Sequence, residues 1–413
     1  MMSCKRVYNI IDFGATENEL STVAIQDAIN TCADNGGGTV LIENGTFISG
    51  TLFMKSNVSL YIASGAKLRM SGDINDFPDF HCEWNERTAS FYNAKCFIYI
   101  GNCENVSIYG LGIIDCNGKA YCMENPEPKV SATDPFLYTR MIRKCDYVDS
   151  IGRMIFVMKS KNIILKDFTM TEMAGGWGIW INGCENVSAL NLKISCCPDY
   201  PNSDGIHINC SKDVFVSDCS IHCGDDAVVV RANTKTLNNN DIPCENVIVK
   251  GCSLSSYCHA VRVGYNGDGL IRNCVFSDLI ITNSRDGIAI DFPVIFDKIK
   301  RESVGKNATK IERVSFNNII IDAERFAFKF LIDYSDKVDR SELASVEYVR
   351  NISFNNMKCR TKYFPLLVGR EDCYFEDITF NNCRFDITEK SSASFLPRYI
   401  RNLKTDCVWN IDV

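Results

Sequence analysis

A repeated sequence motif restricts the folds open to this chain more than any other feature. The motif Cys-Glu-Asn-Val begins at Cys103, at Cys184 and at Cys244. Weaker copies, in which polar residues precede Ile or Val, begin at positions 160, 211, 312 and 350. The counterpart positions 162, 186 and 213 are separated by 24 and 27 residues. A repeat with a period in the twenties is typical of a solenoid.

Short apolar runs separated by polar corners fill each period, for example at residues 247–249, 260–263 and 279–281. Leucine-rich repeats have a similar length, but their Leu-x-x-Leu-x-Leu pattern is absent. In a parallel β-helix each strand pairs with its counterpart one coil further on, and inward side chains stack. We therefore predict an all-β fold, a single parallel β-helix over residues 1–413, in which the recurring Cys and Asn side chains form ladders.

Other segments interrupt this regularity. Residues 21–34 combine a helical apolar face with capping residues Ser21 or Thr22, and Gly36–Gly38 follow, so we predict a short helix that caps the N-terminal end of the core. Excursions at 116–152, 232–243 and 295–310 are longer than ordinary turns. Loops of that length on a regular scaffold are often functional, and plain surface insertion is the alternative.

The charge and apolar patterns exclude some partners. A formal net charge of −7 disfavours nucleic acid, which favours a basic face. The sequence has no run of about 18 apolar residues, so no membrane partner is expected. The first residues lack the apolar core of a secretory signal. The sequence leaves the oligomeric state open.

The 22 cysteines have two interpretations. In a secreted protein they would form a disulfide framework, but a chain of this length can build a full core without one. We favour reduced, buried cysteines and a cytoplasmic location. With four His and no matched pair of Cys-x-x-Cys motifs, we expect no zinc, no other metal and no cofactor.

Three aspartates are predicted to lie together. Asp204 precedes Asp225 by 21 residues and Asp226 by 22, which is about one coil. Counterparts in neighbouring coils lie about 4.8 Å apart where their strands pair. Glycoside hydrolysis uses such a group, with one protonated acid on the leaving oxygen and one carboxylate that activates water. A calcium site and ordinary turn aspartates are the alternatives.

His259 comes one coil later, once the excursion at 232–243 is discounted. It could tune or orient the acids, although a single His is as often structural.

At these residues the chain resembles glycoside hydrolase family 28, the polygalacturonases and their relatives. Asn202-Ser203-Asp204 resembles the family's Asn-Thr-Asp motif, Gly224-Asp225-Asp226 matches Gly-Asp-Asp, and Cys258-His259-Ala260 keeps the His of Gly-His-Gly. Residues 12–15, 24–32, 36–40 and 50–58 look like the family's opening. The resemblance implies a right-handed parallel β-helix and an inverting glycosidase acting on a pectic or related plant-type oligosaccharide.

The resemblance also implies roles for single residues. Asp225 would be the general acid, Asp204 and Asp226 would hold and deprotonate the attacking water, and His259 would support the acid. Asn202 would position the sugar or an acid. Arg231 takes the place of a basic residue that often follows the Gly-Asp-Asp motif.

The chain departs from the family at its fourth motif, Arg-Ile-Lys. Ala289 and Asp291 stand where the two cations would grip a uronate carboxylate. Asp291 would repel that group, so we expect either another base to serve, Arg262, Arg285 or Arg231, or a neutral or differently decorated sugar. We favour an unusual pectic oligosaccharide over plain polygalacturonate.

Two other classes of function are open. A polysaccharide lyase would need a catalytic base and usually calcium, and a glycan-binding β-helix would need no acids. A cytoplasmic hydrolase would meet imported oligosaccharides, so we expect exo-action on short chains, with the excursion at 116–152 closing the groove. Trp177 is a candidate sugar platform, as are Trp180, Tyr121 and Tyr265.

Overall fold

The computed structural model describes residues 6–79, 95–128, 140–145, 149–237, 241–293, 307–332, 345–389 and 394–411. The chain divides into two compact units. One comprises Met1–Asn85, Tyr92–Ile206 and Phe215–Gly224, and the other Glu86–Phe91, His207–Val214 and Asp225–Val413. Each unit is built of stacked parallel strands, and the prediction of a single domain over residues 1–413 stays a prediction.

The described residues of the first unit form two α-helices and many short strands. The helices are α1 (Thr22–Asp34) and α2 (Gly118–Tyr121). The strands are β1 (Val7–Asn9), β2 (Gly38–Ile42), β3 (Gly45–Ser49), β4 (Leu52–Phe53), β5 (Val58–Ile62), β6 (Ala66–Met70), β7 (Cys96–Gly101), β8 (Glu104–Tyr109), β9 (Ile113–Asp115), β10 (Cys122–Glu124), β11 (Met141–Arg143), β12 (Arg153–Met158), β13 (Lys161–Lys166), β14 (Thr169–Thr171), β15 (Trp177–Asn182), β16 (Glu185–Leu190), β17 (Lys193–Ser195) and β20 (Ser220–Cys223). The strands β18 (Ile206–Asn209) and β19 (Lys212–Ser217) have residues in both units.

Each strand of a coil pairs in parallel with its counterpart in the next coil. Ile155 of β12 pairs with Ile98 of β7 on one side and with Ile179 of β15 on the other, and all three side chains are fully buried. The strands β13 and β14 repeat this arrangement, with β8 and β9 before them and β16 and β17 after them. A coil of three strands that stacks its apolar side chains in this way is a parallel β-helix, as predicted.

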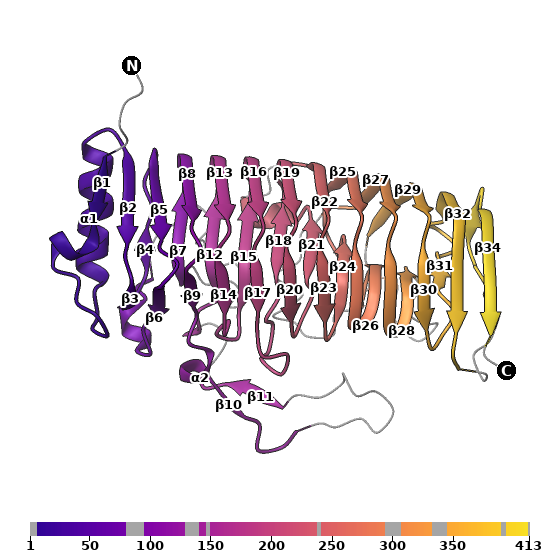
Figure 1. Ribbon diagram of the computed structural model, residues 1–413. Helices are drawn as coiled ribbons and strands as arrows, with labels where there is room; N and C mark the ends of the chain where they lie inside the picture. Colours follow the sequence, from indigo (N-terminus) through magenta and orange to yellow (C-terminus); the bar gives the residue numbers. More distant parts are fainter. Residues whose placement is uncertain are drawn as a thin grey trace. The chain divides into compact units, whose positions relative to one another are not determined.

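The helix α1 lies beside β1 and β2, at the end of the stack of coils where the chain begins (Figure 1). It buries Ala24, Ile25, Ala28, Ile29 and Cys32, whereas the apolar side chain of Val23 is exposed. Ser21 is the N-terminal cap residue, but its hydroxyl donates to backbone carbonyls before the helix and makes no capping bond. At Gly37, where φ is +99°, an added Cβ would lie 2.4 Å from the Asn57 carbonyl oxygen. The position of α1 and its buried apolar face confirm the predicted capping helix.

The predicted excursions fall between strands. Within 116–152, the described residues form α2 and an antiparallel hairpin of β10 and β11, which projects from the coils (Figure 1). Within 232–243, residues 234–237 form one turn of 3₁₀ helix. Most of 295–310 lies outside the described residues, and its last two positions already belong to β27.

The second unit contains the longest strands of the described residues, together with several short ones. They are β21 (Val228–Arg231), β22 (Cys244–Lys250), β23 (Ser253–Ser256), β24 (His259–Val263), β25 (Leu270–Ser277), β26 (Ile280–Asp291), β27 (Thr309–Asn317), β28 (Ile320–Leu331), β29 (Val346–Asn355), β30 (Lys358–Thr361), β31 (Leu366–Val368), β32 (Phe375–Ile387), β33 (Ile400–Arg401) and β34 (Lys404–Ile411). No described helix of the protein has both the length and the apolarity needed to cross a bilayer.

Aromatic side chains form the core of the second unit. Phe276, Phe316, Phe354 and Phe380 come from register-paired positions of β25, β27, β29 and β32. Their rings stack with centroids 5.0, 5.0 and 4.7 Å apart. Because neighbouring parallel strands hold equivalent side chains about 4.8 Å apart, stacked rings fill this core at the spacing of the backbone.

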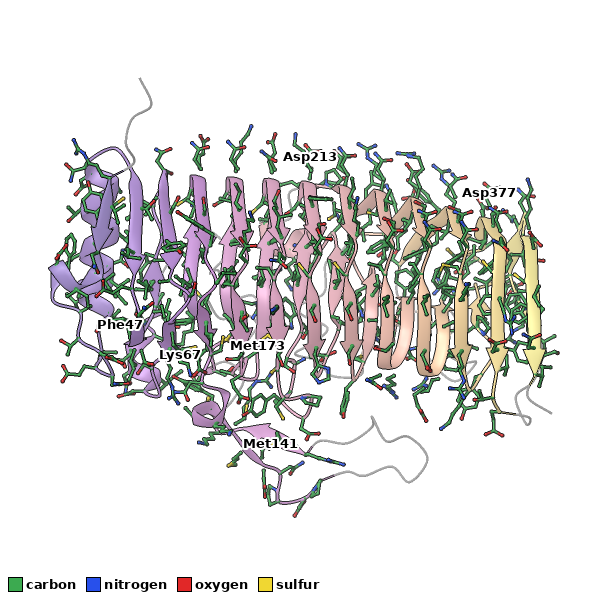
Figure 2. The ribbon with its side chains drawn as sticks, in the orientation of Figure 1. Phe47, Lys67, Met141, Met173, Asp213 and Asp377 are labelled. Carbon is green, nitrogen blue, oxygen red and sulfur yellow. The ribbon has the colours of Figure 1, made fainter. Side chains whose placement is uncertain are left out.

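The predicted amide ladders run along the corners. In the first unit Asn57, Asn105, Asn162 and Asn186 are joined by amide hydrogen bonds of 3.0, 3.0 and 2.8 Å. Each has a positive φ, which Asn tolerates better than most residues. Figure 2 shows Asp213 and Asp377 at the corresponding edge of the second unit, also with positive φ. The recurring Asn and Asp residues therefore occupy the turn positions that require a positive φ.

The described cysteines are all free thiols, most of them buried. At the repeat positions the thiols of Cys103 and Cys184 donate to the backbone carbonyls two residues earlier. Burial raises the pKa of Cys184 to about 12. These side chains act as small apolar residues, as predicted.

Candidate active site

The candidate site in the second unit centres on Asp226, a buried carboxylate between β20 and β21. His259 Nδ1 lies 2.7 Å from its Oδ1, and the His259 backbone N–H donates to the same oxygen at 3.2 Å. Arg262 Nε donates to Oδ2 at 2.6 Å. Both oxygens of the carboxylate are therefore held by groups of β24.

The charges around Asp226 keep it ionised. Burial alone would raise its pKa, but the guanidinium of Arg262 and the imidazole of His259 lower it well below the usual range of an aspartate. Asp226 is therefore a carboxylate at neutral pH, a form that can accept a proton but has none to donate.

The parallel register of the sheet brings Arg262 to this position. It stands between Val229 of β21 and Ala289 of β26. The guanidinium also reaches Asp291 on β26 through Nη1 at 2.5 Å.

Asp225 occupies a different environment, although it is the next residue in the chain. It is half-exposed, and its Oδ1 accepts the backbone N–H of Asp226 at 3.0 Å. Its own backbone carbonyl accepts a hydrogen bond from Ser256 Oγ at 2.6 Å. Two adjacent carboxyl groups are thus held in unlike surroundings, one buried against cations and one partly open to solvent.

Asp291 is neutralised by two cations. Arg262 Nη1 and Lys329 Nζ each lie 2.5 Å from one of its oxygens. Burial alone would raise the pKa of Asp291, but Arg262, His259 and Lys329 lower it well below its usual range. The sequence analysis took Asp291 as a free negative charge, whereas the structure places it between two bases.

The sequence analysis missed Lys329. It pairs with Ala289 in the register of β28 against β26, so it lies one coil beyond the expected fourth motif. The excursion between these strands lengthens the separation to 40 residues, from 289 to 329, which hid the relation. Figure 1 shows β24, β26 and β28 as successive strands of the second unit.

Behind His259 lies a second buried acid, Asp286. Its Oδ2 is 3.6 Å from His259 Nε2, and Arg325 Nε is 3.5 Å from Oδ1. Among the described residues, neither oxygen of Asp286 has a hydrogen-bond partner, and neither does His259 Nε2. Asp286 and Arg325 were also missed, because sequence spacing alone does not show which side of His259 a residue faces.

The remaining predicted bases are placed differently. Arg231 makes a two-pronged ion pair with the fully buried Asp268, at 2.7 and 2.8 Å, and lies over the ring of Tyr265. This pairing favours a structural role for Arg231. Arg285 is half-exposed on β26. Their part in substrate binding stays a prediction.

Three predicted site residues belong to the first unit, namely Asn202, Asp204 and Trp177. Asp204 is buried, and its backbone carbonyl accepts the N–H of Gly178 at 2.8 Å. Asn202 has a φ of 50° and accepts a hydrogen bond from Arg143 of β11 at 2.8 Å. The excursion at 116–152 therefore contacts the Asn202 segment.

Ser203 and Gly224 connect the two acid motifs. The Gly224 N–H donates to Ser203 Oγ at 3.0 Å, and a Cβ at Gly224 would lie 2.3 Å from the Pro198 carbonyl oxygen. Asp204 and Asp225 follow these two residues directly in the chain. Only glycine permits this close approach.

Trp177 is only 9% exposed. The guanidinium of the fully buried Arg153 lies 4.1 Å from the centre of its ring and 4.6 Å from that of Trp180. Because this cation occupies a face of the indole, Trp177 is better placed as a packing residue than as an open sugar platform. Its predicted role in binding stays a prediction.

A possible set of metal ligands also surrounds His259. The oxygens of Asp226, the thiol of Cys258 and the ring of His259 offer atoms within 4.8 Å of one another. Arg262 Nη2, however, lies 3.0 Å from His259 Nδ1, and this fixed positive charge opposes a metal cation. Burial also raises the pKa of the Cys258 thiol, which disfavours the thiolate that a metal would need.

Comparisons with known proteins agree with this picture. An endo-polygalacturonase from Pectobacterium carotovorum is 24% identical over 89% of this chain and 85% of its own length. A polygalacturonase of Arabidopsis thaliana is 23% identical over 60% of this chain, which spans 58% of that relative. Among solved structures, the exopolygalacturonase of Thermotoga maritima matches 98% of this chain and 92% of its own, with a TM-score of 0.76 at 18% identity. The endo-xylogalacturonan hydrolase of Aspergillus tubingensis matches 99% and 100%, with a TM-score of 0.67 at 17% identity.

These structures share one fold, the right-handed parallel β-helix predicted for this chain. The family described as Glycosyl hydrolases family 28 matches residues 32–395, most of the sequence. The chain therefore belongs to glycoside hydrolase family 28 and is a polygalacturonase-like glycosidase.

Proposed function

We propose that this glycosidase cleaves its substrate with inversion, using Asp225 as the general acid and Asp226, with Asp204, to activate water. The observation that carries the proposal is the environment of Asp226. Arg262 and His259 hold it as a carboxylate, the form that a base for water requires.

The proposed division of labour follows from the unlike surroundings of the two adjacent acids. Asp226 is buried against the guanidinium of Arg262, whereas Asp225 is half-exposed and accepts the backbone N–H of Asp226. Neighbouring carboxyl groups in unlike environments are a common way to separate an acid from a base. The predicted one-coil spacing and the bond between Ser203 and Gly224 support Asp204 as the third member.

For the substrate, we infer a pectic or related oligosaccharide whose cleaved unit is neutral or carries a masked carboxylate. The two cations nearest to position 289, Arg262 and Lys329, both bind Asp291, and Arg262 also binds Asp226. Two positive charges thus face two carboxylates. The positive charges of Arg262 and Lys329 are therefore balanced by the two aspartates, and this group has no net positive charge with which to bind a uronate.

The test is the release of reducing ends from oligogalacturonides, rhamnogalacturonan fragments and neutral aryl glycosides. Each substrate is assayed with the wild type and with Asp225→Asn. We expect activity on one class and its loss in the variant. The anomeric configuration of the first product, followed by proton NMR, tests inversion directly. A product that absorbs in the ultraviolet would instead identify a lyase.

We also propose a cytoplasmic location, because the described cysteines are free thiols, which persist in a reducing compartment. Fractionation of the source cells with antibody detection tests this. Recovery of the protein outside the cytoplasmic membrane would contradict it.

A further inference from the structure

Two cysteines of the second unit face each other across neighbouring strands. Cys383 of β32 and Cys407 of β34 are register partners in parallel strands, and Figure 1 shows these strands side by side at the C-terminal end. Register partners in neighbouring strands lie about 4.8 Å apart. A disulfide spans Cα separations of about 4.4–6.8 Å, so the sheet already holds this pair within bridging range.

The two thiols also interact with each other. The Cys383 thiol donates to the backbone carbonyls of Asn381 at 3.4 Å and Phe354 at 3.6 Å. Hydrogen bonding with the Cys407 thiol lowers the pKa of Cys383, and the same contact raises the pKa of Cys407. The register and this contact therefore agree that the two sulfur atoms are neighbours.

Solvent reaches the two sulfur atoms to different degrees. Cys383 is 2% exposed, whereas Cys407 is partly exposed. The neighbouring Val408 of β34 is 58% exposed, so this strand borders solvent. A small oxidant can consequently meet Cys407 first, with the buried Cys383 beside it.

We propose that Cys383 and Cys407 form a reversible disulfide that joins β34 to β32 when a small disulfide such as glutathione disulfide accumulates. The Cys407 sulfur attacks one sulfur of glutathione disulfide, and one glutathione leaves as its thiol with the proton of Cys407. The Cys383 sulfur then attacks the Cys407 sulfur and displaces the second glutathione, which takes the second proton. The two cysteines are oxidised by two electrons, and these electrons reduce glutathione disulfide to two thiols.

The bond acts on the end of the second unit and goes beyond the proposed reaction, because neither cysteine belongs to the acid group. In a reducing compartment such a disulfide is transient and responds to oxidation. It closes a loop over residues 383–407 and so restricts the unfolded states of this segment. The strand β34 should therefore open less often in the oxidised protein.

The test incubates the purified protein with glutathione disulfide, alkylates the remaining thiols and maps disulfides by mass spectrometry. Cleavage after Lys, Arg and Glu places the two cysteines on separate peptides, and the cut at Glu376 separates Cys383 from Cys373. We expect peptide 377–384 to be linked to peptide 405–413. Treatment with dithiothreitol should release the two peptides again.

Two variants test the order of the two steps. In Cys383→Ser, Cys407 should retain glutathione as a mixed disulfide, because the thiol that would displace it is gone. In Cys407→Ser, the buried Cys383 should stay a free thiol. Hydrogen exchange at the β34 amides should slow about tenfold or more when the wild type is oxidised. Neither variant should show that change.

The matched control is the pair Cys244 and Cys274, which are both fully buried. Their register partners in β25 and β22 are Ile271 and Val247, so the strands do not align the two sulfur atoms. The same oxidation should leave this pair as free thiols. A bridge between them would show that nearby burial, rather than register, decides which thiols join, and would overturn the proposal.

A competing thiol gives a further way for the proposal to fail. Cys359 is near enough to raise the pKa of Cys407, yet its register partner in β32 is Phe385. A bridge from Cys359 to Cys383, or free thiols at Cys383 and Cys407 after oxidation, would overturn the proposal. The assay needs no sugar, so either result leaves the proposed glycosidase reaction as it was.

Discussion

The guanidinium of Arg262 joins Asp226 to Asp291, with Nε 2.6 Å from one carboxylate and Nη1 2.5 Å from the other. All three side chains are buried, so these charges interact with less screening by solvent than surface charges do. The first prediction concerns this cation.

Replacing Arg262 by Met should destabilise the protein by about 3–5 kcal/mol, because it leaves two buried carboxylates without their shared partner. Urea unfolding monitored by circular dichroism measures the loss. Arg360→Met is the matched control, since Arg360 is an exposed arginine 4.0 Å from its acid. Equal stability of the two variants would contradict the role given to Arg262.

The second prediction concerns Asp225, the proposed general acid. Asp225→Asn should lower kcat by about 10²–10⁴-fold, the range for loss of a general acid, and KM should change little. The half-exposed position of Asp225 makes misfolding of this variant improbable, and a thermal melt checks it. Residual activity close to that of the wild type would transfer the acid role to another residue.

Stability should depend on pH through Asp226. Its pKa is lowered in the folded protein, so its contribution is present above the unfolded value of about 3.9 and is lost as the pH falls below it. The difference in unfolding free energy between the wild type and Asp226→Asn should therefore shrink between about pH 5 and pH 3. Urea titrations at several pH values measure it, and a constant difference would contradict the ionised state.

The neutralised Asp291 predicts a change in substrate preference. Asp291→Asn would release charge on Arg262 and Lys329, so the ratio of kcat/KM for an oligogalacturonide over a neutral substrate should rise about tenfold, within the energy of one charge-assisted hydrogen bond. Lys329→Met, which removes charge instead, should not raise the ratio. A rise in both variants would show that the effect is not one of charge.

Thiol titration tests the cysteine ladders. In the native protein an aromatic disulfide reagent at pH 8 should react first with partly exposed thiols such as Cys145. The raised pKa values of Cys258 and Cys407, which are also partly exposed, should slow their reaction. The buried Cys184, with a pKa raised to about 12, should react only after unfolding. Rapid reaction of most of the 22 cysteines in folded protein would contradict their place in the core.

The repeat in the sequence was sufficient to predict the fold class. A period near 24 residues with Asn at each corner makes each coil equivalent to the next. The local sequence pattern therefore also predicts which strands pair in the tertiary structure. The helical apolar pattern located the helix at 21–34. Breaks in the period predicted the three excursions, and most of the one at 295–310 lies outside the described residues.

The sequence also brought the acids of the site and His259 into one prediction, since residues one coil apart are neighbours in any parallel β-helix. It could not find Lys329, Arg325 or Asp286. Lys329 and Arg325 lie beyond an excursion that obscures the period, and the contacts of all three depend on which way their side chains turn across the strands.

What the sequence determined by itself is therefore the β-helix and the neighbourhood of Asp226. What only the tertiary structure decided is the charge state of that neighbourhood. Asp291 seemed a repulsive charge in the sequence, yet Arg262 and Lys329 neutralise it. The physical reason is that coil spacing fixes which residues are near one another, whereas an ion pair requires the side chains to meet at about 2.5–3 Å in a buried place.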